Sequence, residues 1–153
     1  MYFLLVICTL LIFPAASIIA EAALSQHALP FITLAGKWLA FWAVGIRLCI
    51  AGARQAMQPR FTAEEIFRVH DPASLPIVRE VGFANLSMGL LGICSVYRPG
   101  WTIPAALAGG LFYGLAGFGH VFQKGKNAKE YLAMVSDWYV FFALMAFLWS
   151  SLM

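Results

Sequence analysis

The chain has 153 residues, of which 62% are hydrophobic and 11% are charged, and its formal net charge is +3. A soluble domain is usually about half apolar and about a quarter charged, so this composition excludes an ordinary soluble fold. The few basic residues are too dispersed for a nucleic-acid-binding surface, and the partner that we expect first is a lipid bilayer.

Five long apolar runs predict a single domain, an all-α transmembrane helical bundle. About 20 residues cross the hydrocarbon of a bilayer, and backbone groups in lipid must pair within their own segment, as they do in a helix. The runs are continuously apolar, whereas barrel strands alternate between polar and apolar residues. We expect spans at residues 2–20, 31–53, 77–97, 101–123 and 128–152.

The first run has a second interpretation as a cleaved signal peptide, which would leave four spans. Ala20-Glu21-Ala22 fits the small-residue pattern of a cleavage site, but no Lys or Arg precedes the apolar core. We therefore expect a retained helix.

The basic residues lie mainly in the polar segment 54–76 and around the loop before the fifth span. The positive-inside rule places these loops and the N-terminus in the cytoplasm, and the C-terminus in the periplasm or outside. This predicts a multi-pass protein of the plasma membrane. The residues are Arg54, Arg60, Arg68, Lys124, Lys126 and Lys129.

Two capping patterns mark helix starts near these loops. Thr62-Ala-Glu-Glu65 predicts a short helix that continues through Val69 and stops at Asp71-Pro72. It lies either on the membrane surface or against the bundle. Asn127, with Glu130 three residues later, is expected to cap the fifth span.

Small residues form stripes on the third and fourth spans, where they allow membrane helices to approach closely. We interpret these two spans as an antiparallel pair packed within one subunit, with a second copy of the chain as the alternative use of the stripes. The packing glycines are Gly82, Gly89, Gly92, Gly110, Gly114 and Gly117.

Five polar or ionisable residues from four spans fall in the cytoplasmic half of the predicted bilayer. Such residues are costly in a membrane and usually face the bundle interior. They are candidates for a pocket that binds a small ligand or relays protons, or for a purely structural polar network. The residues are Arg47, Glu80, Asn85, His120 and Asp137.

The sequence lacks the motifs of well-defined metal, hydrolase, phosphate-binding and haem sites. The cysteines form no Cys-x-x-Cys pair, and there is no His-Glu-x-x-His, no Gly-x-Ser-x-Gly and no phosphate-binding glycine loop. A transmembrane haem normally takes two histidines within spans, and only His120 qualifies. We therefore expect no metal and no cofactor, and no catalytic residue is assigned.

Several stretches resemble an uncharacterised family of small bacterial integral membrane proteins. They are Glu80-Val-Gly-Phe-Ala-Asn-Leu, Gly89-Leu-Leu-Gly92, Gly114-Leu-Ala-Gly-Phe-Gly-His120 and the region around Asp137. The resemblance runs from Phe61 onward, and the loop at 71–76 departs from the family pattern. It implies a helical membrane topology and a bacterial source, and it carries over no activity.

Three functions follow as hypotheses. The first is a ligand-binding or proton-relaying site formed by the polar cluster. The second is a non-catalytic accessory or scaffold subunit that binds another membrane protein, suggested by the small size and the glycine faces. The third is an intramembrane isomerase with a carboxylate and a histidine as acid and base. Because no catalytic motif is present, we expect the chain not to be an enzyme.

Overall fold

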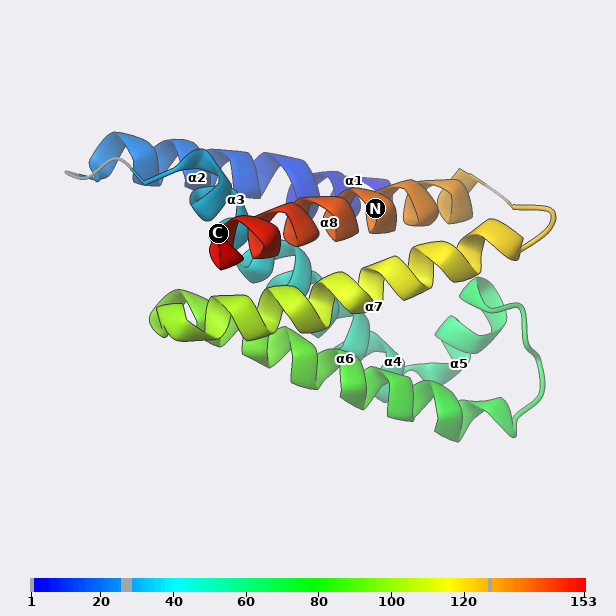
Figure 1. The fold of residues 1–153 in the computed structure, drawn as a ribbon. Helices are drawn as coiled ribbons and strands as arrows, with labels where there is room; N and C mark the ends of the chain where they lie inside the picture. Colours follow the sequence, from blue (N-terminus) through cyan, green and yellow to red (C-terminus); the bar gives the residue numbers. More distant parts are fainter. Residues whose placement is uncertain (1, 26–28, 127) are drawn as a thin grey trace.

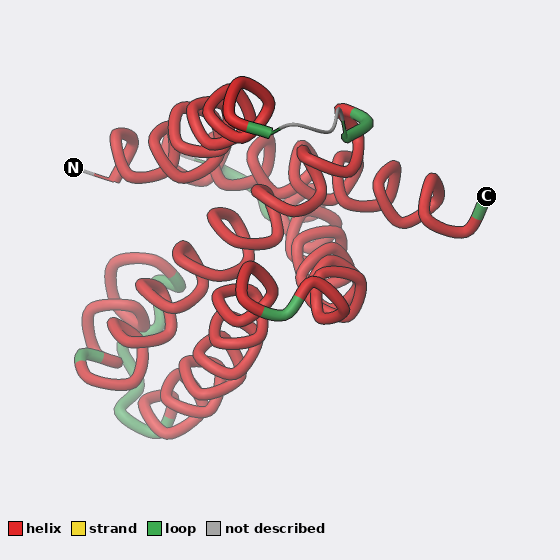
Figure 2. The backbone as a smooth tube through the Cα atoms, turned by 90° about the vertical axis from the view of Figure 1, so that its left-hand side faces the viewer, coloured by secondary structure: helices red, strands yellow, loops and turns green. Residues whose placement is uncertain are grey.

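The computed structural model describes residues 2–25, 29–126 and 128–153, with only the backbone described at positions 2 and 129. Figure 2 shows helices joined by short loops, and no strand occurs in these ranges. Five helices are long and apolar enough to cross a membrane, which confirms the predicted bundle. They are Phe3–Leu24, Phe31–Met57, Ser74–Tyr97, Pro99–Phe122 and Glu130–Leu152.

The first two spans are each interrupted by a π-helical segment. The first consists of α1 (Tyr2–Ile7), the π-helical η1 (Cys8–Ile12) and α2 (Phe13–Leu24). The second consists of α3 (Phe31–Leu39), the π-helical η2 (Ala40–Ile46) and α4 (Arg47–Met57). Such segments often occur at functional sites, because they redirect the side chains that follow.

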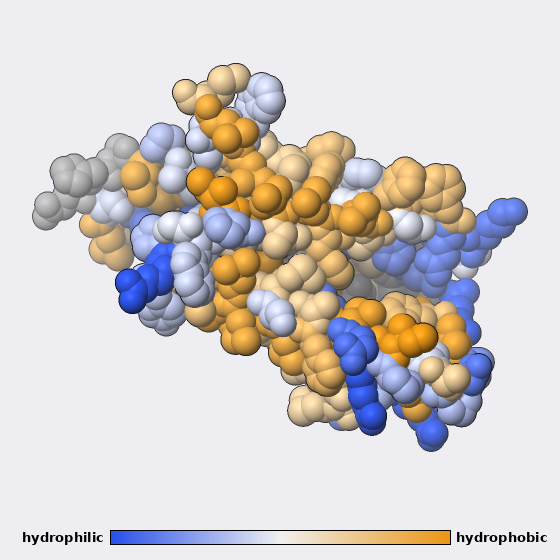
Figure 3. Space-filling view, turned by 60° about the horizontal axis from the view of Figure 1, so that its bottom comes forward, coloured by the Kyte–Doolittle hydropathy of each residue, from blue (hydrophilic) through white to orange (hydrophobic). Residues whose placement is uncertain are grey.

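The other spans are regular α-helices. They are α6 (Ser74–Tyr97), α7 (Thr102–Phe122), preceded by a 3₁₀ turn η4 (Pro99–Trp101), and α8 (Ala128–Leu152). Figure 1 shows α5 (Pro59–Phe61) and the connection between α7 and α8 at one end of the bundle, with the turn before α7 at the other. Apolar residues cover the middle of the surface in Figure 3, and hydrophilic residues gather toward both ends.

The polar segment forms a helix that begins and ends earlier than predicted, made of α5 (Pro59–Phe61) and the π-helical η3 (Thr62–Ile66). The prediction that it continues through Val69 was wrong. Arg68 adopts a left-handed backbone conformation with φ of 56°, and the Val69 N–H donates to the Ala63 carbonyl at 2.9 Å. This closure ends a helix at its C-terminus. Thr62 has helical backbone angles and lies inside this helix, so it is not the cap that the pattern predicted. The predicted cap at Asn127 lies outside the described residues.

The glycine stripe of the third span packs on the second span, where the sequence predicted the fourth. A Cβ atom added to Gly92 would lie 2.5 Å from the backbone nitrogen of Gly45, and one added to Gly89 would lie 2.7 Å from that of Cys49. Gly82 faces Ala56 in the same way, at 2.8 Å. The prediction missed that the second span has small residues of its own at the contact.

The glycines of the fourth span pack mainly on the fifth. Added Cβ atoms on Gly110 and Gly114 would lie 2.5 Å and 2.6 Å from the side chains of Met145 and Phe141. Gly117 faces the indole of Trp138 at 3.3 Å. The bundle is thus built from two close pairs, the second span with the third and the fourth with the fifth.

Candidate functional site

The π-helical segment η2 determines where the second span presents Arg47. Arg47 is the first residue of α4, directly after η2. The Ala43 carbonyl in η2 accepts a hydrogen bond of 2.6 Å from the buried Tyr113 hydroxyl of α7. The Arg47 guanidinium carbon lies 5.3 Å from the centre of the Tyr113 ring, a cation–π contact. Arg47 therefore points into the bundle.

Asp137 of α8 lies at the centre of the polar residues. Its side chain is only 7% exposed, and its Oδ1 atom is 3.6 Å from Nη2 of Arg47. Its Oδ2 atom is 3.7 Å from Nε2 of His120 on α7. The neighbouring Ser136 hydroxyl accepts a hydrogen bond of 3.3 Å from Arg47 Nη2. We call Arg47, His120 and Asp137 the central cluster; it joins the second, fourth and fifth spans.

A line of hydrogen bonds connects the central cluster to the surface. His120 Nδ1 lies 3.2 Å from Oε1 of Gln123, and Gln123 Nε2 donates to Glu130 Oε1 at 3.0 Å. The other oxygen of Glu130 accepts from Arg68 at 3.1 Å, and the Arg68 side chain is half exposed. Polar contacts thus run from the buried Asp137 to a cation at the end of the bundle.

This line favours one of the two neutral tautomers of His120, the one with its hydrogen on Nδ1. Glu130 is paired with Arg68 and acts as an acceptor, so the amide nitrogen of Gln123 faces it and the amide oxygen faces His120. An amide oxygen only accepts, so Nδ1 of His120 is the donor. A neutral His120 then presents the lone pair of Nε2 toward the Asp137 carboxylate, and two acceptors face each other across 3.7 Å.

The structure does not bring the other two predicted residues into this cluster. Asn85 is 2% exposed, and its Nδ2 donates to Gln55 of α4 at 2.8 Å. Glu80 is exposed on α6. Glu80 and Asn85 are five positions apart, and their side chains point about 140° apart around an α-helix. When Asn85 points inward, Glu80 therefore points away.

No group of three or more metal-ligating side chains (His, Cys, Asp or Glu) is placed to hold a metal ion within the described ranges. The three cysteines Cys8, Cys49 and Cys94 are free thiols. The central cluster itself offers an acid, a base and a cation.

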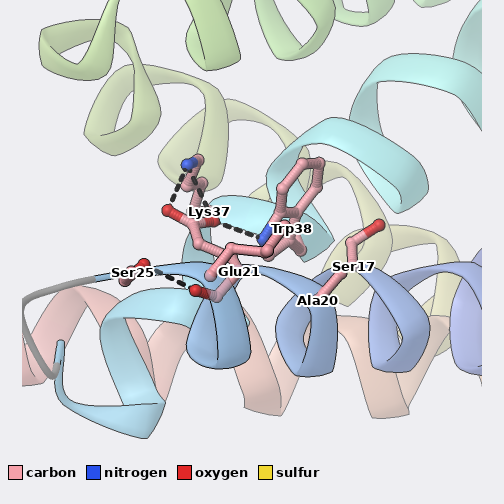
Figure 4. Close-up of a pocket in the computed structure, with 7 residues that line it drawn as sticks. Ser17, Ala20, Glu21, Ser25, Lys37 and Trp38 are labelled. Carbon is pink, nitrogen blue, oxygen red and sulfur yellow. Dashed lines mark hydrogen bonds and ion pairs between the residues drawn. The ribbon is translucent and has the colours of Figure 1, made fainter.

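A second polar site, which the sequence analysis missed, lies between α2 and α3 (Figure 4). Both oxygens of Glu21 accept from the Lys37 ammonium, at 2.6 Å and 2.8 Å, and one also accepts from the Trp38 indole at 2.7 Å. The sequence contains a signal for this pair. Glu21 is three residues before the end of one span, and Lys37 lies in the second turn of the next, so an antiparallel hairpin puts them at similar depth.

Comparison with known proteins identifies a family for the whole chain. The model of a family of unknown function, DUF6790, matches residues 1–152, a longer stretch than the residues from Phe61 onward that the motifs indicated. No curated protein and no solved structure matches. The chain therefore belongs to the DUF6790 family, a family of unknown function.

Proposed function

We propose that this chain is a proton-binding membrane bundle in which Asp137 and His120 share one exchangeable proton. The observation that supports this is the pair of acceptors, His120 Nε2 and Asp137 Oδ2, that face each other at 3.7 Å. A proton bound to either atom turns a repulsive contact into a favourable one. The site therefore favours the state with one proton over the empty state.

Arg47 keeps the Asp137 carboxylate paired after the proton is released. With the proton bound on His120, Asp137 has a cation on each side, at 3.6 Å and 3.7 Å. After the proton leaves, Arg47 remains as the counter-ion. A buried carboxylate without any cation is strongly disfavoured. The cluster can thus change its charge by one.

The two partners differ in their access to water. The side chain of His120 is 29% exposed, whereas that of Asp137 is 7% exposed. His120 is suited to exchange the proton with the aqueous phase, and Asp137 to hold it inside the bundle. Gln123, bound to Glu130, keeps the ring turned toward Asp137.

The exchange opens toward the cytoplasm in this proposal. The end of the bundle that holds Arg68 and Glu130 also holds most of the basic residues, and basic loops remain in the cytoplasm. The N-terminus is then cytoplasmic and the C-terminus lies on the far side of a bacterial inner membrane. The basic residues are Arg54, Arg60, Arg68, Lys124 and Lys126.

The proton-binding function is favoured over the intramembrane isomerase. An isomerase needs a cavity for its substrate beside the acid or base. One hollow of the described structure is lined by residues between positions 17 and 38, and another by residues between 60 and 75. Neither touches Asp137 or Glu80.

Infrared difference spectroscopy of the full chain in lipid, between two pH values, tests the proposal. We expect a carboxylic-acid signal and an imidazole signal to change together in a single step. In Asp137→Asn the carboxylic-acid signal disappears, and the imidazole step shifts or is lost. Glu80→Gln is the matched control, because it removes an exposed carboxylate from a span and should leave both signals intact. Wild-type signals that persist in Asp137→Asn would overturn the proposal.

A further inference from the structure

The second polar site lines an open hollow of about 430 Å³ at the end of the first helical hairpin. Figure 4 shows Glu21 from α2 turned toward Lys37 and Trp38 from α3, with the carboxylate between them. Ser17 and Leu24 also line the hollow. This site is at the opposite end of the bundle from Arg68 and plays no part in the proton-binding cluster.

Two hydrogen-bond donors remain available in this hollow. The Lys37 ammonium has three N–H groups, and the described contacts use it for two bonds, both to Glu21. The Ser17 hydroxyl accepts from the Trp42 indole at 3.0 Å, which leaves its own hydrogen free to donate. The hollow thus offers two donors beside the Glu21 carboxylate.

The depth of the hollow fits the headgroup region of a bilayer. Glu21 is three residues from the end of α2, and Lys37 is about 9 Å from the start of α3 at the helical rise. Trp38, beside Lys37, is an amphipathic residue typical of the membrane interface. Leu24, on the rim at the end of α2, is 84% exposed.

We propose that this hollow binds the headgroup of a zwitterionic phospholipid with a primary ammonium, such as phosphatidylethanolamine. The phosphate accepts from Lys37, and the ammonium donates to the Glu21 carboxylate. The wall of the site contains both a carboxylate and an ammonium. A ligand with one charge of each sign complements this wall, whereas the Glu21 carboxylate repels a purely anionic headgroup. A choline headgroup lacks an N–H and cannot donate.

Native mass spectrometry of the full chain, purified from a membrane of equal parts phosphatidylethanolamine, phosphatidylcholine and phosphatidylglycerol, tests this proposal. We expect one phosphatidylethanolamine to be retained in preference to the other two lipids. Equal retention of all three, or preference for phosphatidylglycerol, would overturn it.

Two double variants connect the lipid to these residues. Glu21→Gln with Lys37→Met removes both charges while Gln can still accept from Trp38, and we expect roughly tenfold weaker retention, the usual effect of losing charged hydrogen bonds. Glu21→Lys with Lys37→Glu keeps an ion pair, and so protects the fold, but reverses its direction. Wild-type retention by both variants would disprove the site.

The reversed pair also separates a lipid from a soluble zwitterion with the same chemistry. Free glycerophosphoethanolamine can turn around and bind the reversed pair, whereas a lipid tethered by its acyl chains cannot. We expect loss of lipid in the reversed variant and no displacement of lipid from wild type by glycerophosphoethanolamine. Displacement, with binding retained by the reversed pair, would overturn the lipid assignment in favour of a soluble ligand.

Discussion

The two polar sites of this bundle use the same kinds of groups in different geometries. At one end, the Glu21 carboxylate and the Lys37 ammonium are in direct contact at 2.6 Å, with side chains 20% and 29% exposed. In the central cluster, Asp137 lies 3.6 Å from Arg47 and 3.7 Å from His120, and its side chain is 7% exposed. The charged groups of the more exposed pair are in hydrogen-bond contact, whereas those of the more buried cluster stand about 1 Å farther apart.

This difference shows which site is suited to change its charge. A directly bonded pair at the interface is satisfied, and its charges are partly screened. The buried Asp137 carboxylate depends on Arg47 and, when His120 is protonated, on His120 as well, because each unpaired charge in the interior is costly. The central cluster should therefore respond strongly to substitution and to protonation, and the hairpin pair weakly.

The largest effect is expected from Arg47→Met, which leaves Asp137 with His120 as its only cation in the central cluster. We expect a loss of about 3–5 kcal/mol in the free energy of unfolding, as for other broken buried pairs. Reversible unfolding in mixed micelles measures it. A loss of less than about 1 kcal/mol in the free energy of unfolding, as for exposed ion pairs, would mean that the central cluster stabilises the fold no more than the Glu21–Lys37 pair does.

A companion double variant separates stability from function. Arg47→Met combined with Asp137→Leu removes both charges, and replacing a buried pair with apolar residues is often neutral or stabilising. We expect stability to return to within about 1 kcal/mol of wild type. The shared-proton signal should be absent. If stability does not return, the ion pair itself holds the helices together.

A smaller effect is expected from Tyr113→Phe, which breaks the contact between α7 and the π-helical segment. The hydroxyl donates to the Ala43 carbonyl at 2.6 Å inside the core, so its loss leaves a buried acceptor and should destabilise by about 1–3 kcal/mol. The same unfolding assay applies. Retained stability together with an altered proton signal would show that Tyr113 serves only to position Arg47.

The sequence predicted the spans and the depth of the polar residues, but not their directions around each helix. Depth follows from counting along an apolar run, which is why Arg47 and Asp137 could be paired in advance. The direction of Arg47 depends on η2, and no local residue pattern marks a π-helical segment. For Glu80 the information was present, since the glycine stripe that includes Asn85 already fixed the inward face of that span.

Helix partners were harder to predict than helix faces. The stripes on the third and fourth spans were recognised, but a stripe does not identify its partner. The second span offers Gly45 and Gly52 at the contact with the third. These glycines are seven residues apart, which puts them on nearly the same face of an α-helix, but the sequence analysis did not single them out as a stripe.

Lys37→Met should have a smaller effect than either buried substitution. Glu21 keeps its hydrogen bond from Trp38, and the lost pair is partly exposed, so we expect a loss of about 1 kcal/mol or less. The difference between wild type and Lys37→Met should shrink as salt is added, because exposed pairs are screened. A loss as large as that of Arg47→Met would mean that the ion pair between Glu21 and Lys37 is needed to hold α2 and α3 together.

The smallest effect is expected from Glu80→Gln, which tests whether a carboxylate at nearly the right depth is enough to join the site. Glu80 is exposed and lies on the side of α6 turned away from Asn85, so we expect a stability change within about 0.5 kcal/mol, as for most surface substitutions. The proton signal of the central cluster should be unchanged, because the side chain is not among its contacts. A lost or shifted signal would mean that proton exchange passes along the outer face of the third span and not through His120.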